Sequence, residues 1–201
     1  MTGDTEINEG ETATFEAIAT DSRNDTLTYT WDFGDGTSQL TVESDSLPVS
    51  HEYQGNGDYT VTLTVVDEEG AGASSTLNVT INNIAPMIAE ITGETNISEG
   101  TEVTYSASAT DLGDDTLSYS WDFEDGNTAE GRDVTHIYSD NGNYTITLTV
   151  TDDDGASSTQ TLDITVNNVA PTIDEIIGET DVKEGQEVSY SAIVSDSVMT
   201  P

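Results

Sequence analysis

Apolar and polar side chains alternate along two similar stretches of the chain, each of which contains one of its two tryptophans. A period of two residues is typical of a strand that buries one face. Each stretch ends just before an Asp-Gly pair, which favours a turn. Each stretch therefore predicts a strand whose tryptophan anchors a core. The apolar positions are Leu27, Tyr29, Trp31 and Phe33 in the first stretch, and Leu117, Tyr119, Trp121 and Phe123 in the second.

The stretch from 83 to 168 contains a complete series of such segments separated by turn signals, and none of them has a helical period. Short strands in this number predict an all-β fold, an immunoglobulin-like β-sandwich. The segment around Asn96 is expected to be a turn between the first two strands. The strands are predicted at Met87–Ile91, Thr101–Ala109, Leu117–Phe123, Asn127–Gly131, Val134–Tyr138, Asn143–Val150 and Ser158–Val166.

The chain repeats this unit. Glu9-Gly10, Glu99-Gly100 and Glu184-Gly185 correspond when the copies are aligned. We expect a first domain at 1–82 that lacks most of its first strand, a complete domain at 83–168, and the truncated start of a third repeat at 169–201. The first copy is longer between its tryptophan strand and His51, so residues 37–50 are expected to form a loop or a loose edge strand.

Charge is the main compositional feature, with 3 basic and 40 acidic residues and a net charge of -37. Nucleic acid and anionic membrane surfaces are excluded as partners, because both require Lys and Arg. No apolar run approaches the roughly 20 residues that cross a bilayer, so direct membrane insertion is not expected. Such self-repulsion needs compensation, either from a salty medium or from divalent cations bound at fixed places.

Three acidic segments are expected to meet at one pole of the second sandwich, where the chain enters and two loops turn. Carboxylates that repel one another converge more readily around a cation, and carboxylate with amide oxygen suits calcium better than magnesium. The alternative is that these are exposed loops whose Asp and Gly form turns. The predicted ligands are Asn83, Asp111, Asp114, Asp115, Asp152 and Asp154. The first copy offers Asp21, Asp25 and Asp67 without a linker Asn, so its site should be weaker.

No catalytic group is evident in the sequence. The paired carboxylates of the two Asp-Gly turns, Asp32 with Asp35 and Asp122 with Asp125, lack a base partner in the pattern and are interpreted as turn formers. One histidine per copy, His51 and His136, is interpreted as structural. Tyr59 and Tyr144 are expected to serve as corner or core tyrosines. We therefore expect a protein that is not an enzyme.

The motif Trp31-Asp-Phe-Gly-Asp-Gly36, followed by His51-Glu-Tyr53 and Gly57-Asp-Tyr59-Thr-Val-Thr-Leu-Thr-Val65, resembles the PKD (polycystic kidney disease) domain. The second copy departs from this motif with Glu124 where Gly is usual. The resemblance implies an extracellular, immunoglobulin-like module of a bacterial or archaeal surface protein, or one beside the catalytic domain of a secreted protease or chitinase. It also implies that calcium can bind the linker Asn and the Asp residues of the two loops, as some PKD domains do.

Two functions remain open at this stage. The first is a spacer or adhesion module in a large cell-surface or extracellular protein, in which neighbouring repeats are the partners and calcium rigidifies the junctions. The second is an accessory module that binds an insoluble polymer for a secreted enzyme, and it needs an exposed row of aromatic rings. The inward register of the aromatic residues counts against the second. The acidity fits a halophilic or marine source.

Overall fold

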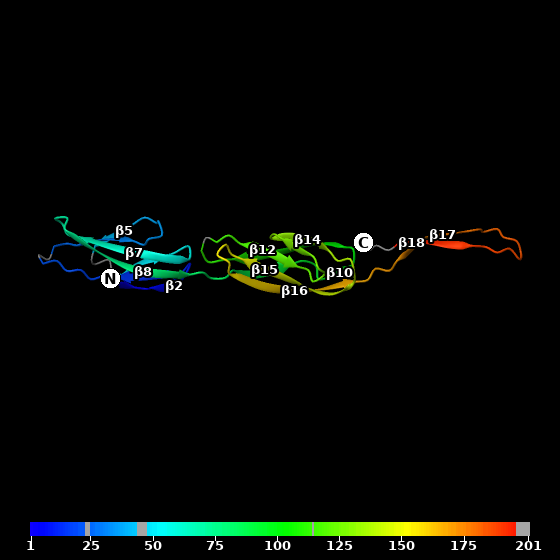
Figure 1. Cartoon of the computed structure of the whole chain (residues 1–201), viewed down its shortest axis with the longest axis horizontal. Helices are drawn as coiled ribbons and strands as arrows, with labels where there is room; N and C mark the ends of the chain where they lie inside the picture. Colours follow the sequence, from blue (N-terminus) through cyan, green and yellow to red (C-terminus); the bar gives the residue numbers. More distant parts are fainter. Residues whose placement is uncertain (23–24, 44–47, 114, 196–201) are drawn as a thin grey trace. The chain divides into compact units, whose positions relative to one another are not determined.

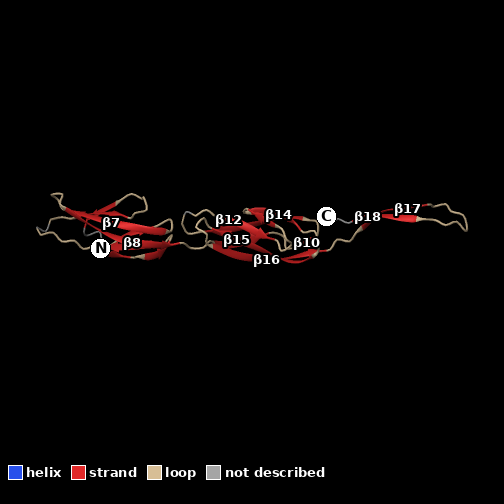
Figure 2. Ribbon diagram, viewed as in Figure 1, coloured by secondary structure: helices blue, strands red, loops and turns tan. Residues whose placement is uncertain are grey.

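The structure is a computed structural model that describes residues 1–22, 25–43, 48–113 and 115–195. Regular structure in these residues consists of β-strands joined by loops (Figures 1 and 2). Within these ranges no helix is long and apolar enough to cross a bilayer. The all-β prediction is confirmed.

Two sheets form the first repeat. The smaller sheet has the order β1-β3-β6, and the larger has the order β2-β8-β7-β4-β5. The smaller consists of β1 (Thr2–Gly3), β3 (Thr12–Glu16) and β6 (Val49–Glu52). The larger consists of β2 (Glu6–Asn8), β4 (Thr28–Asp32), β5 (Leu40–Glu43), β7 (Gly57–Val66) and β8 (Gly72–Asn82).

The second repeat has the same two sheets, in the orders β14-β11-β9 and β10-β16-β15-β12-β13. The first of them consists of β9 (Met87–Thr92), β11 (Glu102–Thr110) and β14 (Asp133–Ile137). The second consists of β10 (Asn96–Ser98), β12 (Ser118–Asp122), β13 (Thr128–Glu130), β15 (Gly142–Thr151) and β16 (Ser157–Asn167). All seven predicted strands are present, and every boundary agrees to within one residue. The immunoglobulin-like sandwich is confirmed.

After the second repeat, β17 (Thr172–Gly178) and β18 (Tyr190–Ser195) form a two-stranded antiparallel sheet. Every residue of the two strands is exposed. Exposure follows from length, because two strands offer no second layer to cover them.

Two very short strands escaped the sequence analysis. In each repeat a three-residue strand near the start pairs in parallel with the last strand: β2 with β8, and β10 with β16. Figure 1 shows β2 beside β8. The prediction of a turn around Asn96 is therefore wrong, because Asn96 is the first residue of β10 and pairs with Thr165. Three residues are too few to show a period of two.

The tryptophans lie where the alternation predicts, since Trp31 and Trp121 are both 0% exposed. In the first repeat, Phe15 of β3 packs against Trp31 of β4 at a ring-centroid distance of 6.0 Å, which joins the two sheets. In the second repeat, Tyr105 of β11 takes the same place at 6.5 Å from Trp121. Each repeat therefore has its own core.

By its contacts the chain divides into two compact units. The first consists of Met1–Met87 together with Thr110–Leu117 and Thr151–Ser157, and the second contains the remaining described residues. The two loops of the second repeat that carry most of the predicted metal ligands thus belong to the first unit, together with the linker after β8. The site can therefore be described within that unit.

Candidate metal centre

The linker that follows β8 is tied to the loop between β15 and β16. Asn83 donates a hydrogen bond from Nδ2 to Asp152 Oδ2 at 3.2 Å. The other Asp152 oxygen accepts from the Ala156 backbone N–H at 2.8 Å, and the side chain is buried. Asp152 thus closes its own loop and orients Asn83. The amide oxygen of Asn83, Oδ1, is buried and has no hydrogen-bond partner.

The loop between β11 and β12 supplies the next two oxygens. Asp111 Oδ1 accepts from the Leu112 N–H at 2.8 Å, whereas its Oδ2 is buried without a partner. Asp115 Oδ2 is also buried without a partner. Asp114 lies outside the described residues. This loop thus holds two buried carboxylate oxygens that have no hydrogen-bond partner among the described residues.

The third carboxylate comes from Glu9, in the turn after β2, and the sequence analysis missed it. Glu9 is 0% exposed, and its Oε1 accepts from the Ile84 N–H at 2.7 Å. Its Oε2 has no hydrogen-bond partner, and one of its carboxylate oxygens lies within 4.8 Å of one carboxylate oxygen each of Asp111 and Asp115. We call Glu9, Asp111 and Asp115 the acidic cluster.

Close packing holds the acidic cluster together. Gly113 has a φ of +99°, and a Cβ at this position would lie 2.6 Å from the Gln54 carbonyl oxygen and 3.3 Å from Glu9 Oε2. The loop can therefore approach Glu9 this closely only with glycine. The Leu112 side chain would meet a Cβ on Gly10 at 3.1 Å, so the turn after Glu9 is held on the same loop.

Burial and mutual repulsion disfavour the charged forms of the acidic cluster. Burial raises the pKa of Glu9, the Ile84 N–H partly offsets that rise, and Asp115 and Asp111 add to it. Burial also raises the pKa of Asp111, and the hydrogen bond from the Leu112 N–H partly offsets that rise. The pKa of Asp115 is raised by burial first and then by Asp153 and Asp111. Like charges held out of water are costly unless a cation joins them.

The remaining predicted ligands form two further groups. Asp154 lies with Asp115 and Asp153, so Asp115 belongs to two carboxylate groups. In the first repeat, Asp21, Asp25 and Asp67 also come together within the same limit of 4.8 Å. Asp67 Oδ1 accepts from Glu69 and Ala71, as Asp152 does from Ala156, and Asp25 Oδ2 is buried without a partner.

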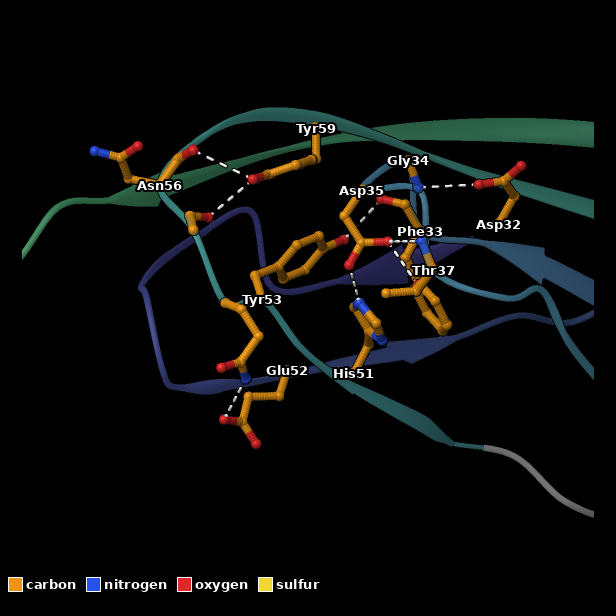
Figure 3. Close-up of polar contacts among 12 residues, drawn as sticks. Asp32, Phe33, Gly34, Asp35, Thr37, His51, Glu52, Tyr53, Asn56 and Tyr59 are labelled. Carbon is orange, nitrogen blue, oxygen red and sulfur yellow. Dashed lines mark hydrogen bonds and ion pairs between the residues drawn. The ribbon is translucent and has the colours of Figure 1, made fainter. Parts of the chain in front are cut away.

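The carboxylates of the Asp-Gly turns behave differently. Asp32 Oδ1 accepts from the Gly34 N–H at 3.0 Å, and Asp35 Oδ1 accepts from Thr37 through both its N–H and its hydroxyl. Figure 3 shows Asp35 between Thr37 and His51, whose Nε2 lies 2.6 Å from Asp35 Oδ2. Burial raises the pKa of Asp35, but the hydrogen bonds from Thr37 and His51 outweigh burial and set it below the usual value. The prediction of turn formers is confirmed.

The two histidines have structural positions. His51 stacks on Phe33 at a centroid distance of 4.0 Å, with the rings 2° from parallel, and meets the edge of Tyr53 at 4.8 Å. His136 repeats the arrangement on Phe123 and holds Asp125 at 2.8 Å. The predicted corner tyrosines are confirmed as well, since their hydroxyls donate to the carbonyls of Gly55 and Asp140, four residues earlier.

Comparison with known proteins assigns these repeats. A model of the PKD domain matches residues 1–81 and 83–166. The chain belongs to the PKD domain family. Pre-pro-metalloprotease PrtV of Vibrio cholerae is 31% identical over 156 residues, which cover 78% of this chain and 16% of that protein. A microbial collagenase of Vibrio alginolyticus is 34% identical over 88 residues, or 43% of this chain and 11% of the collagenase.

A solved structure gives a further comparison for a single PKD repeat. The crystal structure of the PKD1 domain from the Vibrio cholerae metalloprotease PrtV shares 36% sequence identity, covers 42% of this chain and 99% of that domain, and has a TM-score of 0.36. The chain spans only 16% and 11% of the length of these two curated relatives.

Proposed function

We propose that this chain is a non-catalytic tandem PKD module of a larger extracellular protein, and that calcium at the linker between its two PKD repeats limits the motion of that linker. The neighbouring repeats are its direct partners. The ion would be held by Asn83, Asp111 and Asp115, and the nearby Asp154 would add to the negative field. The bound cation would replace repulsion among the loops with attraction.

One observation supports this proposal most strongly. Buried oxygens of Asn83, Asp111 and Asp115 are without hydrogen-bond partners, although the neighbouring Asp152 has both of its oxygens occupied. A buried polar atom without a partner costs free energy unless something outside the chain completes it. Carboxylate and amide oxygens at a loop pole are the ligands that calcium takes. The Asp21, Asp25 and Asp67 group is proposed as a second, weaker site, because no amide oxygen from a preceding linker accompanies it.

Similarity to part of a metalloprotease and of a collagenase supports a second candidate function, an accessory module that holds a secreted enzyme on its polymer. The surface does not favour this function. Among the described residues, Tyr190 is the only exposed aromatic side chain, at 63%. A flat polymer surface is bound through several exposed rings rather than one. The spacer function is therefore the better supported of the two.

Calcium titration of the purified chain at constant high ionic strength tests the proposal, because general charge screening is then held fixed. We expect a Kd of about 10⁻⁴–10⁻³ M, as in other extracellular modules, and a rise in melting temperature. Small-angle scattering with calcium or EGTA should report a narrower distribution of dimensions when calcium is bound. Magnesium at the same concentration is the control for ionic strength.

The variant Asp111→Asn should abolish the response of the second repeat to calcium, and Glu16→Gln, on the exposed face of β3, should leave it intact. If calcium changes neither the melting temperature nor the scattering curve of the unmodified chain, the calcium function is wrong. The acidic loops would then be a solvated surface, and the chain a spacer without an ion.

A further inference from the structure

We propose that the first PKD repeat supplies a ligand to the calcium ion of the second, and that this ligand is Glu9 Oε2. The inference rests on the proposed function and deepens it, because the site would then be complete only when two consecutive repeats are present. The chemical class of the ligand is a divalent cation bound through oxygen. A comparison of the two repeats by sequence alone would assign all the ligands of such a site to one repeat.

The two oxygens of Glu9 have different environments. Oε1 accepts the Ile84 N–H at 2.7 Å, which secures the linker just after β8. Oε2 belongs to the same fully buried side chain, has no hydrogen-bond partner, and faces the loop of Asp111 and Asp115, 3.3 Å from the position of a Cβ on Gly113. One oxygen of Glu9 lies within 4.8 Å of an oxygen of each of these two aspartates. A buried carboxylate oxygen near two other carboxylates is unfavourable by itself. It becomes favourable when a cation lies among the three.

The distances suit one calcium ion. Calcium binds oxygen at about 2.3–2.6 Å, so two ligands of one ion are at most about 5.2 Å apart. The three oxygens of the acidic cluster lie within 4.8 Å of one another. Asn83 Oδ1, buried and unpartnered beside Asp152, offers a neutral fourth oxygen. Three carboxylates and one amide leave two to four of calcium's six to eight positions for water or backbone.

Glu99, in the corresponding turn of the second repeat, shows which part of the role of Glu9 is structural and which part is the proposed binding of an ion. Glu99 Oε1 accepts the Val169 N–H at 2.7 Å, as Glu9 accepts Ile84, and Glu99 is also buried. Glu99 is not part of any of the carboxylate groups found among the described residues. Securing the linker therefore requires one oxygen of the Glu-Gly turn, and Glu9 has a second oxygen free for an ion.

Glu9→Gln in the full chain is the central test, with calcium chloride in isothermal titration calorimetry as the probe. Glutamine keeps the length and the acceptor for the Ile84 N–H but removes the charge. We expect the Kd of the second-repeat site to rise at least tenfold. Glu99→Gln, the matched turn variant, and Glu16→Gln, the matched charge variant, should change that Kd less than twofold.

Glu9→Asp separates a ligand from a distant charge, because it keeps the charge and withdraws the oxygen by about 1.5 Å, the length of one carbon–carbon bond. A direct ligand predicts that Glu9→Asp also weakens binding several-fold. Melting in EGTA tests that each variant is folded, and Glu9→Gln should melt at or above the unmodified chain there, since a repelled charge is gone.

Calcium binding by Glu9→Gln with unchanged Kd, while Asp111→Asn abolishes binding, would overturn the inference and leave the proposed function standing. A Glu9→Asp variant that binds as tightly as the unmodified chain would also overturn it, because the charge would then act only at a distance. An unmodified chain that binds no calcium would refute both. Loss of binding in Glu9→Gln and Glu9→Asp, with Glu99→Gln unaffected, would support a site shared by two repeats.

Discussion

The first compact unit holds two groups of carboxylates with opposite environments. In the Asp-Gly turn, both oxygens of Asp35 have partners, namely Thr37 on one side and His51 on the other. In the acidic cluster, each carboxylate retains a buried oxygen without one. The pKa of Asp35 is lowered, and the pKa values of Glu9, Asp111 and Asp115 are raised. A carboxylate whose oxygens all have hydrogen-bond partners stabilises the fold. A carboxylate with a buried oxygen that has no partner destabilises the fold unless a cation binds to it.

Removal of His51, the partner of Asp35, should have the largest effect on stability. His51→Ala deletes a ring stacked on Phe33 and leaves Asp35 Oδ2 without its hydrogen-bond partner, and the two side chains are only 14% and 11% exposed. We expect the free energy of unfolding of the first repeat to fall by about 2–4 kcal/mol, measured in urea melts. Calcium should not alter this loss. His136→Ala should cost a similar amount in the second repeat, and a harmless His51→Ala would show that the stack carries little stability.

Removal of a carboxylate of the acidic cluster should increase the stability of the chain in the absence of calcium, the opposite of the effect of His51→Ala. In EGTA, Asp111→Asn should stabilise the chain by on the order of 1 kcal/mol, because a buried like charge is lost. In calcium at 100 Kd of the linker site, the second repeat of the unmodified chain should gain about 2.7 kcal/mol and that of the variant nothing, so the order of their melting temperatures should reverse. If Asp111→Asn melted below the unmodified chain in both conditions, the aspartate would be a structural residue like Asp35.

The stability of the chain should depend on pH in opposite ways through Asp35 and through the acidic cluster. The contribution of Asp35 is present above its unfolded pKa, about 3.9, and is lost as the pH falls through its lower folded value. The penalty of the acidic cluster is complete above its raised folded pKa values and is relieved as the pH falls through them. Without calcium, stability should therefore first rise on acidification from pH 7 and then fall below about pH 4.

Urea melts in EGTA across this pH range measure that curve. Glu9→Gln should flatten its rising limb more than Glu16→Gln, which removes the same charge from an exposed position. Equal flattening by both variants would attribute the rise to the net charge of the chain rather than to the acidic cluster.

The smallest effect concerns the turn itself. Glu124 has a φ of +63° where the first repeat has Gly34 at +81°. Glu124→Gly should raise the stability of the second repeat by up to about 1 kcal/mol, because glycine adopts this conformation without the cost that a Cβ adds. The gain is limited by loss of the hydrogen bond from the Thr145 N–H to the Glu124 carboxylate. A lower urea midpoint for Glu124→Gly would show that this hydrogen bond outweighs the backbone cost.

Alternation along the sequence was sufficient to predict the long strands, because segments such as β15 span several periods with Ile146, Leu148 and Val150 all facing inward. The Asp residues of two loops were predicted to meet because the sandwich topology fixes where those loops lie. Glu9 was not predicted, since its partner carboxylates lie in the next repeat and no local period links them. The recurrence of Glu-Gly in all three copies was the available signal.

The parallel pairing of β2 with β8 has a consequence for how each repeat folds during synthesis. The strand at the start of the repeat has its partner at the end, and Asn82 donates a hydrogen bond to Glu6 across 76 positions of sequence. The chain must close a loop of this length, at a cost in entropy, before the contact between β2 and β8 can contribute any stability. This requirement slows folding. An edge of β8 can be occupied by β2 only after nearly the whole repeat has been made. Each repeat should therefore become protease-resistant in one late step as its last strand emerges.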